Sequence, residues 1–297
     1  MHWANGFIAV DWGTTNRRAY RLDGSGVCIG EFEDGKGILS VPPGAFPAAV
    51  AEIRDRLGDL PLLLAGMAGS NRGWIEAPYV PCPAGLDDLG AALAWGDERD
   101  AVVPGVSYID EYRADVMRGE EVQLLGAVAA GQVPADALVC HPGTHNKWVV
   151  LDTGRIRSFR TVMTGELFNL LRSHSILSDL LKNEAEPDDA FRRGVRHGFD
   201  EDDLTSDLFA VRARVLLGEA PREEASSYAS GLLIGAEWAD AQRHLSGDEP
   251  VRVIGEPALA ALHAACAGHH GRRVELLDAR QVQRAAWRGL AAQVQPA

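Results

Sequence analysis

The sequence has few cysteines and few basic residues. Its four cysteines, Cys28, Cys82, Cys140 and Cys266, are scattered and form no C-x-x-C pair. This spacing favours neither a zinc site nor a disulfide framework. The 29 lysines and arginines are outnumbered by 42 acidic residues, and the formal net charge is −13. We therefore expect no nucleic-acid partner and no binding to an anionic membrane surface, because both reward clustered positive charge.

Long apolar segments are also missing. No apolar run approaches the ~20 residues that span a bilayer, and the first residues lack the pattern of a secretory signal. The sequence therefore predicts a cytoplasmic protein with no membrane partner. Its apolar fraction of 46% is typical of a globular protein, and 297 residues suffice for two domains. The expected partner is a small molecule, and an anionic one would need a local basic pocket.

The most informative segment is F-I-A-V-D-W-G-T-T-N-R-R-A-Y-R-L-D, residues 7–23. A short apolar strand ends on Asp11, turns on small and hydroxyl residues, and resumes as a second strand. The N–H groups and hydroxyls of the turn could bind a phosphate, and Asp11 could hold Mg²⁺ or its water shell. An ordinary hairpin turn is an equally good interpretation of this segment alone. The turn residues are Gly13, Thr14, Thr15 and Asn16.

The spacing of apolar residues predicts a mixed α/β chain. After the opening hairpin, an expected third strand at 27–33 gives an antiparallel meander, and the apolar run at 62–65 is expected to return as a parallel strand. Further expected strands cover 101–103, 108–109, 138–140, 148–152, 155–159, 251–254 and 274–277. Expected helices cover 44–57, 115–130, 167–181, 188–197, 203–217, 222–244, 258–267 and 279–292. The helix expected over 115–130 has acidic residues in its first turn, which alone is commonly no more than a complement to the helix dipole.

Residues 66–85 are rich in glycine and proline and show no period. A long irregular segment in a compact domain is usually functional, and Arg72 could pair with a substrate carboxylate there. A packed surface loop is the equally weighted alternative. The candidate substrate-binding residues of this segment are Ser70, Asn71, Arg72, Trp74, Glu76 and Tyr79.

Residues 138–159 repeat the opening pattern of strand, glycine-threonine turn and strand, with Gly143 and Thr144 in the turn. This self-similarity suggests two domains of related build. His145 as a zinc ligand and Lys147 as a Schiff-base lysine are both disfavoured, because no companion ligands lie at metal spacing. Turn residues or phosphate contacts are the favoured interpretation.

In this order, the motifs resemble the sugar kinases of the superfold shared by actin, hexokinase and the heat-shock ATPases. The superfold elements are D-W-G-T-T-N at 11–16, an acid-bearing helix at 119–126, P-G-T-H-N-K-W at 142–148 and V-I-G-E-P-A-L at 253–259. Within the superfold the chain resembles the 2-dehydro-3-deoxygalactonokinase family over essentially its whole length. That narrower resemblance rests on G-M-A-G-S-N-R-G-W-I-E-A-P-Y, D-V-M-R-G-E-E, H-P-G-T-H-N-K-W and S-G-L-L-I-G-A-E-W.

The resemblance implies two domains of ribonuclease H-like, actin/hexokinase-type fold with an ATP cleft between them. It implies a sugar-acid-binding domain at 1–131 with the closing helix 279–294, and a nucleotide-binding domain at 132–278. It also implies ATP and Mg²⁺ as cofactors. Many relatives carry Gly-Gly at the adenosine motif, where this chain has Gly255-Glu256-Pro257. Besides the first turn, the implied nucleotide contacts are Gly143, Thr144, His145, Asn146, Lys147, Gly255, Glu256 and Pro257.

The resemblance also implies a catalytic base. Related sugar kinases carry an Asp in a G-D-x-x-A-A-L-x-G helix, and the matching G-E-E-V-Q-L-L-G places Glu120 at that position, with Asp115 as the second candidate. The implied reaction transfers a phosphoryl group from ATP to the 6-hydroxyl of 2-dehydro-3-deoxy-D-galactonate in galactonate catabolism. The alternatives are an exopolyphosphatase-like phosphohydrolase, a kinase of another sugar or sugar acid, and a non-catalytic nucleotide-binding module. A homodimer is left open.

Overall fold

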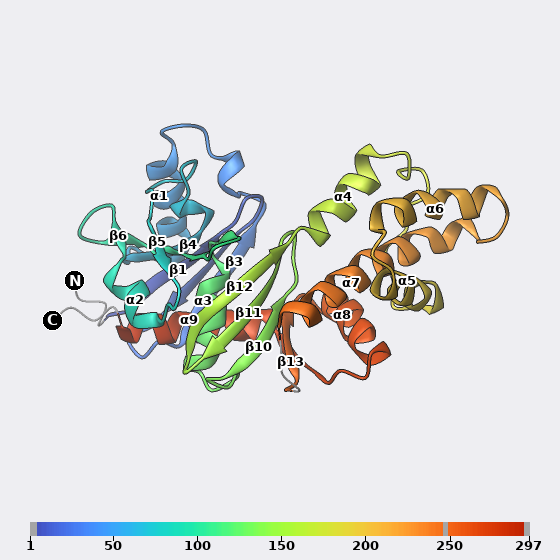
Figure 1. Cartoon of the computed structure of the whole chain (residues 1–297). Helices are drawn as coiled ribbons and strands as arrows, with labels where there is room; N and C mark the ends of the chain where they lie inside the picture. Colours follow the sequence, from blue (N-terminus) through green and yellow to red (C-terminus); the bar gives the residue numbers. More distant parts are fainter. Residues whose placement is uncertain (1–4, 246–248, 294–297) are drawn as a thin grey trace. The chain divides into compact units, whose positions relative to one another are not determined.

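A computed structural model describes residues 5–245 and 249–293 (Figure 1). The chain divides into two compact units. Unit 1 is built from Met1–Asp136, Leu151–Ser158 and Arg280–Ala297, and unit 2 from Ala137–Val150 and Phe159–Ala279. Within the described residues, no helix combines the length and the apolar character needed to cross a membrane.

Unit 1 is centred on a six-stranded sheet. Its strands, in spatial order, are β3 (Cys28–Asp34), β2 (Arg17–Leu22), β1 (Phe7–Trp12), β4 (Leu62–Gly66), β7 (Asp100–Val102) and β6 (Ala94–Trp95). The predicted antiparallel meander is confirmed, since β1 pairs with β2 and β2 with β3. The predicted parallel return of β4 is also confirmed, and the strand with which it pairs is β1. Helix α1 (Phe46–Leu57) buries Phe46, Val50, Ile53 and Leu57 in the core of unit 1, at the spacing of one helix face.

The segment before the acidic helix differs from the prediction. The helix expected over 115–130 was wrong at its start, because Asp115 lies on strand β9 (Ala114–Met117), opposite Tyr108 of β8 (Gly105–Ile109). With β5 (Tyr79–Pro81), these strands form a three-stranded sheet. Gly119 then takes a left-handed φ of 113°, which ends the extended segment and lets helix α3 (Glu120–Ala129) begin. Two short helices, η3 (Met67–Gly69) and α2 (Leu86–Ala91), lie in and after the segment 66–85.

Unit 2 contains a second sheet, whose hairpin tip at 151–158 is counted with unit 1. Its strands, in spatial order, are β12 (Arg155–Val162), β11 (Asn146–Asp152), β10 (Ala137–His141), β13 (Val251–Gly255) and β14 (Val274–Asp278). The β10, β13 and β14 strands are parallel. The helices of unit 2 are α4 (Thr164–His174), α5 (Asp189–Asp200), α6 (Leu204–Leu216), α7 (Ala225–His244) and α8 (Pro257–His269), with short η4 (Arg222–Glu224).

Helix α4 ends earlier than predicted. The expected helix over 167–181 stops at His174, and Ser175 is extended. The Ser175 hydroxyl donates to the Leu171 carbonyl at 2.6 Å and accepts from the Leu177 N–H at 2.9 Å. A serine that bonds the backbone on both sides offers an alternative to the helix ladder and so ends it.

Helices α5 and α7 pack backbone against backbone (Figure 1). A Cβ added at Gly194 of α5 would lie 2.2 Å from the Tyr228 carbonyl oxygen of α7. On α7, a Cβ at Gly231 would lie 2.2 Å from the Phe191 carbonyl oxygen, and one at Gly235 would lie 2.4 Å from that of Val195. These glycines leave no room for side chains, so α7 is fixed against α5.

In unit 1, α9 (Ala279–Gln293) meets α3 in the same way. A Cβ at Gly126 would lie 2.0 Å from the Cα of Ala286, so Gly126→Ala should destabilise the protein by about 1–3 kcal/mol through overpacking. Gly268, inside α8, is the matched control because nothing lies within 4 Å of its added Cβ. Gly268→Ala should leave the melting temperature unchanged or slightly higher, since alanine favours a helix. Equal melting temperatures for both variants by calorimetry would contradict the close contact of α3 with α9.

Candidate active site

Asp11 lies near the end of β1, where three backbone segments come close together. The Gln283 side chain of α9 donates to Asp11 Oδ2 at 2.6 Å, and the Tyr20 hydroxyl donates to Gln283 Oε1 at 3.1 Å. Gly66, at the end of β4, has a φ of 81°, and a Cβ there would lie 3.4 Å from Asp11 Oδ1. A Cβ at Gly119 would in turn lie 3.2 Å from the Cα of Gly66. Glycine at these positions lets β4 approach the Asp11 carboxylate and the start of α3 approach β4 this closely.

The first glycine-threonine turn is held from one side. The Gly37 N–H donates to the Thr15 carbonyl at 2.9 Å, the Ile38 N–H to the Gly13 carbonyl at 3.0 Å, and the Leu39 N–H to the Thr14 carbonyl at 3.3 Å. Thr14, Thr15 and Asn16 are exposed. With its carbonyl groups bound to residues 37–39, the turn can offer N–H groups and hydroxyls to an anion.

The charge on Asp11 is poorly compensated by protein groups. Burial raises the pKa of Asp11 and the negative charge of Glu120 raises it further, whereas Gln283 and Arg18 act in the opposite direction. Asp11 and Glu120 come from separate sequence motifs, and the fold places them close enough for the charge of Glu120 to act on Asp11. A desolvated carboxylate with a second acid nearby fits Mg²⁺, because a divalent cation would supply the missing positive charge.

The two acids at the start of α3 differ in environment. Glu121 is fully buried, and both its oxygens accept from the Gly119 N–H, at 2.9 and 2.7 Å. Burial, with the charge of Glu120, raises the pKa of Glu121 to about 8. Glu120 is partly exposed, and its Oε2 accepts from the Arg118 N–H at 3.2 Å. The buried acid therefore stabilises the Gly119 turn, whereas Glu120 keeps part of its surface exposed to solvent. Sequence reasoning gave Glu121 no such role.

The segment 66–85 is held by an arginine that sequence reasoning also missed. The Arg118 guanidinium lies 4.3 Å from the centre of the Tyr79 ring, and its Nη2 donates to the Ala77 carbonyl at 2.8 Å. A Cβ at Gly69 would lie 2.7 Å from Arg118 Nη1. Arg118 lies within D-V-M-R-G-E-E, directly before the acidic helix. That position in a motif is the one sequence feature that could have suggested a role for it.

The six predicted substrate residues of this segment have different environments. Asn71, Arg72, Glu76 and Tyr79 are exposed. Trp74 packs against the core of unit 1, as a packed loop would require. Ser70 donates to the Met67 carbonyl at 2.8 Å and accepts from the Arg72 N–H at 3.3 Å. Asp115, the second candidate base, is half-buried on β9, where its Oδ1 accepts from the Val116 N–H at 2.8 Å.

The second glycine-threonine turn lies in unit 2. The Gly143 N–H donates to Asn146 Oδ1 at 2.7 Å, and the Thr144 carbonyl accepts from the Glu166 N–H of α4 at 2.8 Å. His145 is exposed and contacts the Glu166 carboxylate, whereas Lys147 is only 4% exposed. The turn is thereby tied both to its own strand β11 and to the first turn of α4.

Beside this turn lies a cavity of about 360 Å³. Its lining includes Gly143 and Thr144 of the turn, and Ala258 and Leu259 of the first turn of α8. Such a volume lies within the usual range for small-molecule sites. Apolar walls come from Phe168, Leu233, Ile234 and Leu262, and polar groups from Asn146, Thr164, Ser230 and Arg172. Gly255, Glu256 and Pro257 do not line the cavity but connect β13 to α8. A ligand with an apolar ring and an attached anion would fit this cavity, with the ring against the apolar walls and the anion at the turn.

Comparison with known proteins adds independent information. The family model for 2-keto-3-deoxy-galactonokinase matches residues 11–293. The 2-dehydro-3-deoxygalactonokinase of Escherichia coli K12 is 39% identical over 258 residues, which cover 86% of this chain and 87% of that protein.

Solved structures agree with that match. A provisionally named 2-dehydro-3-deoxygalactonokinase from Sinorhizobium meliloti superposes with a TM-score of 0.92 at 33% identity, covering 98% of this chain and 100% of that one. A xylulose kinase from Lactobacillus acidophilus has a TM-score of 0.51 at 12% identity, covering 97% and 89%, and so shares the fold alone. The predicted α/β fold of the actin/hexokinase type is confirmed. From the span of the family model and the identity to the Escherichia coli enzyme, this chain belongs to the 2-keto-3-deoxy-galactonokinase family.

Proposed function

We propose that this kinase transfers the γ-phosphoryl group of ATP to the 6-hydroxyl group of 2-dehydro-3-deoxy-D-galactonate. The observation that carries the proposal is the close approach of the end of β4 to Asp11 and of the start of α3 to Gly66, which brings Glu120 near enough for its charge to raise the pKa of Asp11. A metal-binding carboxylate beside a second, accessible acid is what phosphoryl transfer to a hydroxyl requires. The substrate is taken from the family and the Escherichia coli relative. We also propose that the enzyme acts in the cytoplasm and uses the ATP present there.

Asp11 is the residue that would hold Mg²⁺, directly or through water. When bound, the ion supplies positive charge to the phosphate oxygens as negative charge develops on them. Gln283 keeps the Asp11 carboxylate oriented, and Tyr20 in turn fixes the Gln283 amide. The exposed turn at Thr14, Thr15 and Asn16 would offer donors to phosphate oxygens nearby.

Glu120 is the proposed general base. It would accept the proton of the attacking hydroxyl group as the new oxygen–phosphorus bond forms. Glu121 cannot share this role at neutral pH, because its pKa of about 8 keeps it mostly protonated. Asp115 stays the second candidate. We assign the substrate carboxylate to Arg72, and give Arg118 the separate role of holding the loop that carries Arg72.

Unit 1 is the proposed sugar-acid domain and unit 2 the proposed nucleotide domain. The cavity beside Gly143 and Thr144 has the volume and the apolar walls for a nucleoside, and the turn has the backbone groups for a phosphate. His145, Asn146 and Lys147 remain proposed nucleotide residues. Gly255, Glu256 and Pro257 would act through the position of α8.

The function predicts substrate-dependent ADP release. With Mg²⁺ and ATP, ADP should form quickly with 2-dehydro-3-deoxygalactonate and slowly with glucose, with the methyl ester of the sugar acid, or without sugar. A coupled ADP assay measures the rate, and mass spectrometry identifies the phosphorylated product. Phosphate release at a comparable rate without sugar would favour a phosphohydrolase. Fast turnover of the ester or of glucose would favour a kinase of neutral sugars.

Asp11→Asn should nearly abolish turnover without lowering the melting temperature. Asparagine can still accept the Gln283 hydrogen bond, and it removes a charge whose burial is unfavourable, so the fold should be as stable or more stable. Loss of the charge removes the proposed ligand of Mg²⁺. Kinetics across a Mg²⁺ titration and calorimetry give both readouts. Normal turnover at every Mg²⁺ concentration, with a lower melting temperature, would make Asp11 a structural turn residue.

Glu120→Gln should lower kcat by ~10²–10⁴-fold with a modest change in KM, the usual loss for a general base. Glu121→Gln is the matched control at the next position. It should keep kcat within a few-fold, because a neutral amide resembles the protonated acid and can still accept from Gly119. Asp115→Asn should also have a small effect. If Asp115→Asn abolishes kcat while Glu120→Gln stays active, the base is Asp115.

A further inference from the structure

Glu237 is a buried acid to which the proposed mechanism gives no role. It lies on α7 within S-G-L-L-I-G-A-E-W, and only 2% of it is exposed. Three donors from two other elements meet its carboxylate. On β11, Asn146 Nδ2 donates to Oε2 at 2.7 Å and Trp148 Nε1 to Oε1 at 2.7 Å, and the Thr164 hydroxyl at the start of α4 also donates to Oε2.

The contact with Asn146 extends to the phosphate turn. Asn146 Nδ2 donates to Glu237, while Asn146 Oδ1 accepts from the Gly143 N–H at 2.7 Å. An ionised carboxylate can only accept hydrogen bonds, so it requires the NH₂ side of the amide to face it. The oxygen of the amide must then face Gly143. Glu237 thus sets the orientation of the side chain that fixes the turn.

The contact with Thr164 acts on the other side of the same turn. Thr164 is the first residue of α4, and a Cβ added at the next residue, Gly165, would lie 2.1 Å from the Gly143 carbonyl oxygen. The Glu166 N–H then bonds the Thr144 carbonyl at 2.8 Å. The start of α4 and the turn therefore hold each other, and Glu237 is bonded to both. Gly143, Thr144, Asn146, Thr164 and Gly165 all line the 360 Å³ cavity, whereas Glu237 does not.

Glu237 can hold the turn only if its own helix is rigid, and its burial as an acid needs an explanation. The backbone contact of Gly231 and Gly235 with α5 fixes the helix that carries Glu237. A buried carboxylate is unfavourable for stability, and replacing such groups by apolar ones is often neutral or stabilising. Burial raises the pKa of Glu237 to about 7, although the three hydrogen bonds act to lower it. The acid is therefore poorly explained by stability alone.

A metal centre is the other arrangement that could explain the acid. Ligand atoms of Cys140, Glu237 and His263 lie within 4.8 Å of one another. The carboxylate oxygens are already bonded to three donors, however, and His263 Nδ1 accepts from Trp238 Nε1 at 3.2 Å. These hydrogen bonds occupy both Glu237 oxygens and His263 Nδ1, and His263 Nε2 alone has no partner among the described residues. A carboxylate with three donors has little need of an ion.

We propose that Glu237 is a positioning residue for nucleotide binding, which orients Asn146 and the start of α4 so that the turn at Gly143 and Thr144 can receive a phosphate group. This inference rests on the proposed function, because it takes the cavity of unit 2 to be the nucleotide site. It adds a residue that touches no ligand and acts through Asn146 and Thr164.

The test is the affinity for Mg²⁺–ADP of Glu237→Gln, measured by calorimetric titration on the full chain. Glutamine has the same shape but presents an NH₂ group to donors, so at least one of the three bonds is lost. The Kd for ADP and the KM for ATP should rise about tenfold or more, with a much smaller change in the KM for the sugar acid. Faster amide exchange at Gly143 and Thr144 should accompany the loss.

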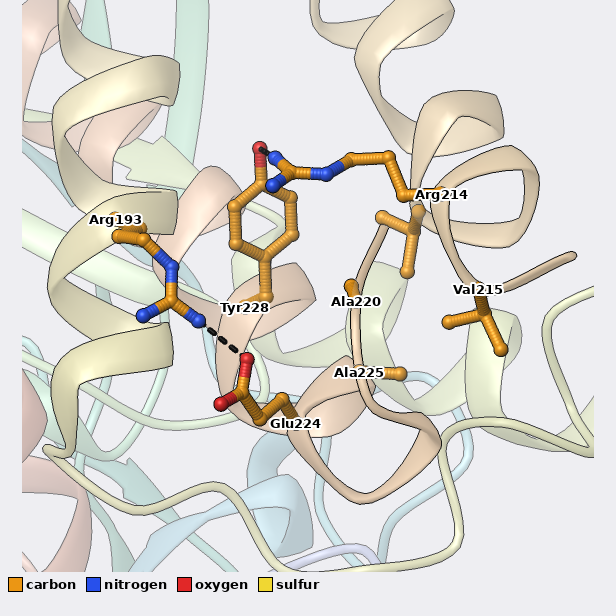
Figure 2. A pocket seen from close by; sticks show the side chains of 8 residues that line it. Arg193, Arg214, Val215, Ala220, Glu224, Ala225 and Tyr228 are labelled. Atoms are coloured by element: carbon orange, nitrogen blue, oxygen red, sulfur yellow. Dashed lines mark hydrogen bonds and ion pairs between the residues drawn. The ribbon is translucent and has the colours of Figure 1, made fainter. Parts of the chain in front are cut away.

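Tyr228→Phe is the matched control on the same helix (Figure 2). Tyr228 is also buried, and its hydroxyl bonds His197 Nδ1 at 2.7 Å and Arg214 Nη1 at 3.2 Å, beside a separate cavity of about 20 Å³. Figure 2 shows this hydroxyl meeting Arg214, near the ion pair of Arg193 with Glu224. The variant should lower the melting temperature and leave the Kd for ADP unchanged.

A double-mutant cycle tests the route of the effect. Because Glu237 acts in part through Asn146, the loss of ADP binding in the double variant Glu237→Gln/Asn146→Ala should be smaller than the sum of the two single losses, and an additive loss would contradict this route. Glu237→Asp retains the charge and should lie between the wild type and Glu237→Gln, and it replaces the latter if that variant does not fold. A wild type that binds no nucleotide would refute the proposed function. A wild type that binds ADP, with Glu237→Gln within twofold of it, would overturn this inference alone, and so would Glu237→Asp within twofold where Glu237→Gln does not fold.

Discussion

A carboxylate bonded to a carboxamide fixes the local geometry in each unit. In unit 1 the Gln283 amide donates to Asp11, and its oxygen accepts from the Tyr20 hydroxyl. In unit 2 the Asn146 amide donates to Glu237, and its oxygen accepts from the Gly143 N–H. An amide can satisfy a carboxylate on one side only, so each pair has a single favourable orientation. The two units differ in which group faces the proposed ligand. In unit 1 it is the acid, Asp11, and in unit 2 it is the amide, Asn146.

Close backbone approach is the second requirement, and glycine provides it. Gly66 brings the end of β4 to the Asp11 carboxylate and Gly119 brings the start of α3 to Gly66, both at left-handed φ values. In unit 2, Gly165 lies against the carbonyl of Gly143. Within each unit, a side chain at one of these positions would push apart the two segments that meet there. The glycine-rich motifs are thus best explained by distances between segments and not by flexibility.

The sequence predicted local features well where the signal was local. The apolar runs with turn residues between them located the first hairpin, the parallel return of β4 and most helices, because these depend on neighbouring residues. The helix expected from Asp115 failed because pairing with β8, which no local pattern reveals, holds that residue in a strand. The Ser175 stop of α4 was local but was outweighed by the apolar spacing of residues 167–181.

The site divides in the same way. Asp11 and Glu120 could be proposed from their positions after a strand and a glycine. The roles of Arg118, Glu121 and Glu237 could not, because each depends on its environment in the fold. Arg118 binds the Ala77 carbonyl, 41 positions away in the chain, and Glu237 binds Asn146, 91 positions away. In the sequence, Glu120 and Glu121 are equivalent acids. Only the structure shows that Glu121 is buried and Glu120 partly exposed.

The buried acids also link the site to the stability of the fold. Asp11, Glu121 and Glu237 all have raised pKa values, about 8 for Glu121 and about 7 for Glu237, against an ordinary value of 4.5 for a glutamate. The folded state therefore binds more protons than the unfolded state between these values, and stability falls as the pH rises through that window. At neutral pH, Glu237 is partly charged and Glu121 mostly neutral. A cation at Asp11 would offset the unfavourable charge there, so binding of Mg²⁺ with a phosphate ligand should stabilise the folded chain while it assembles the site.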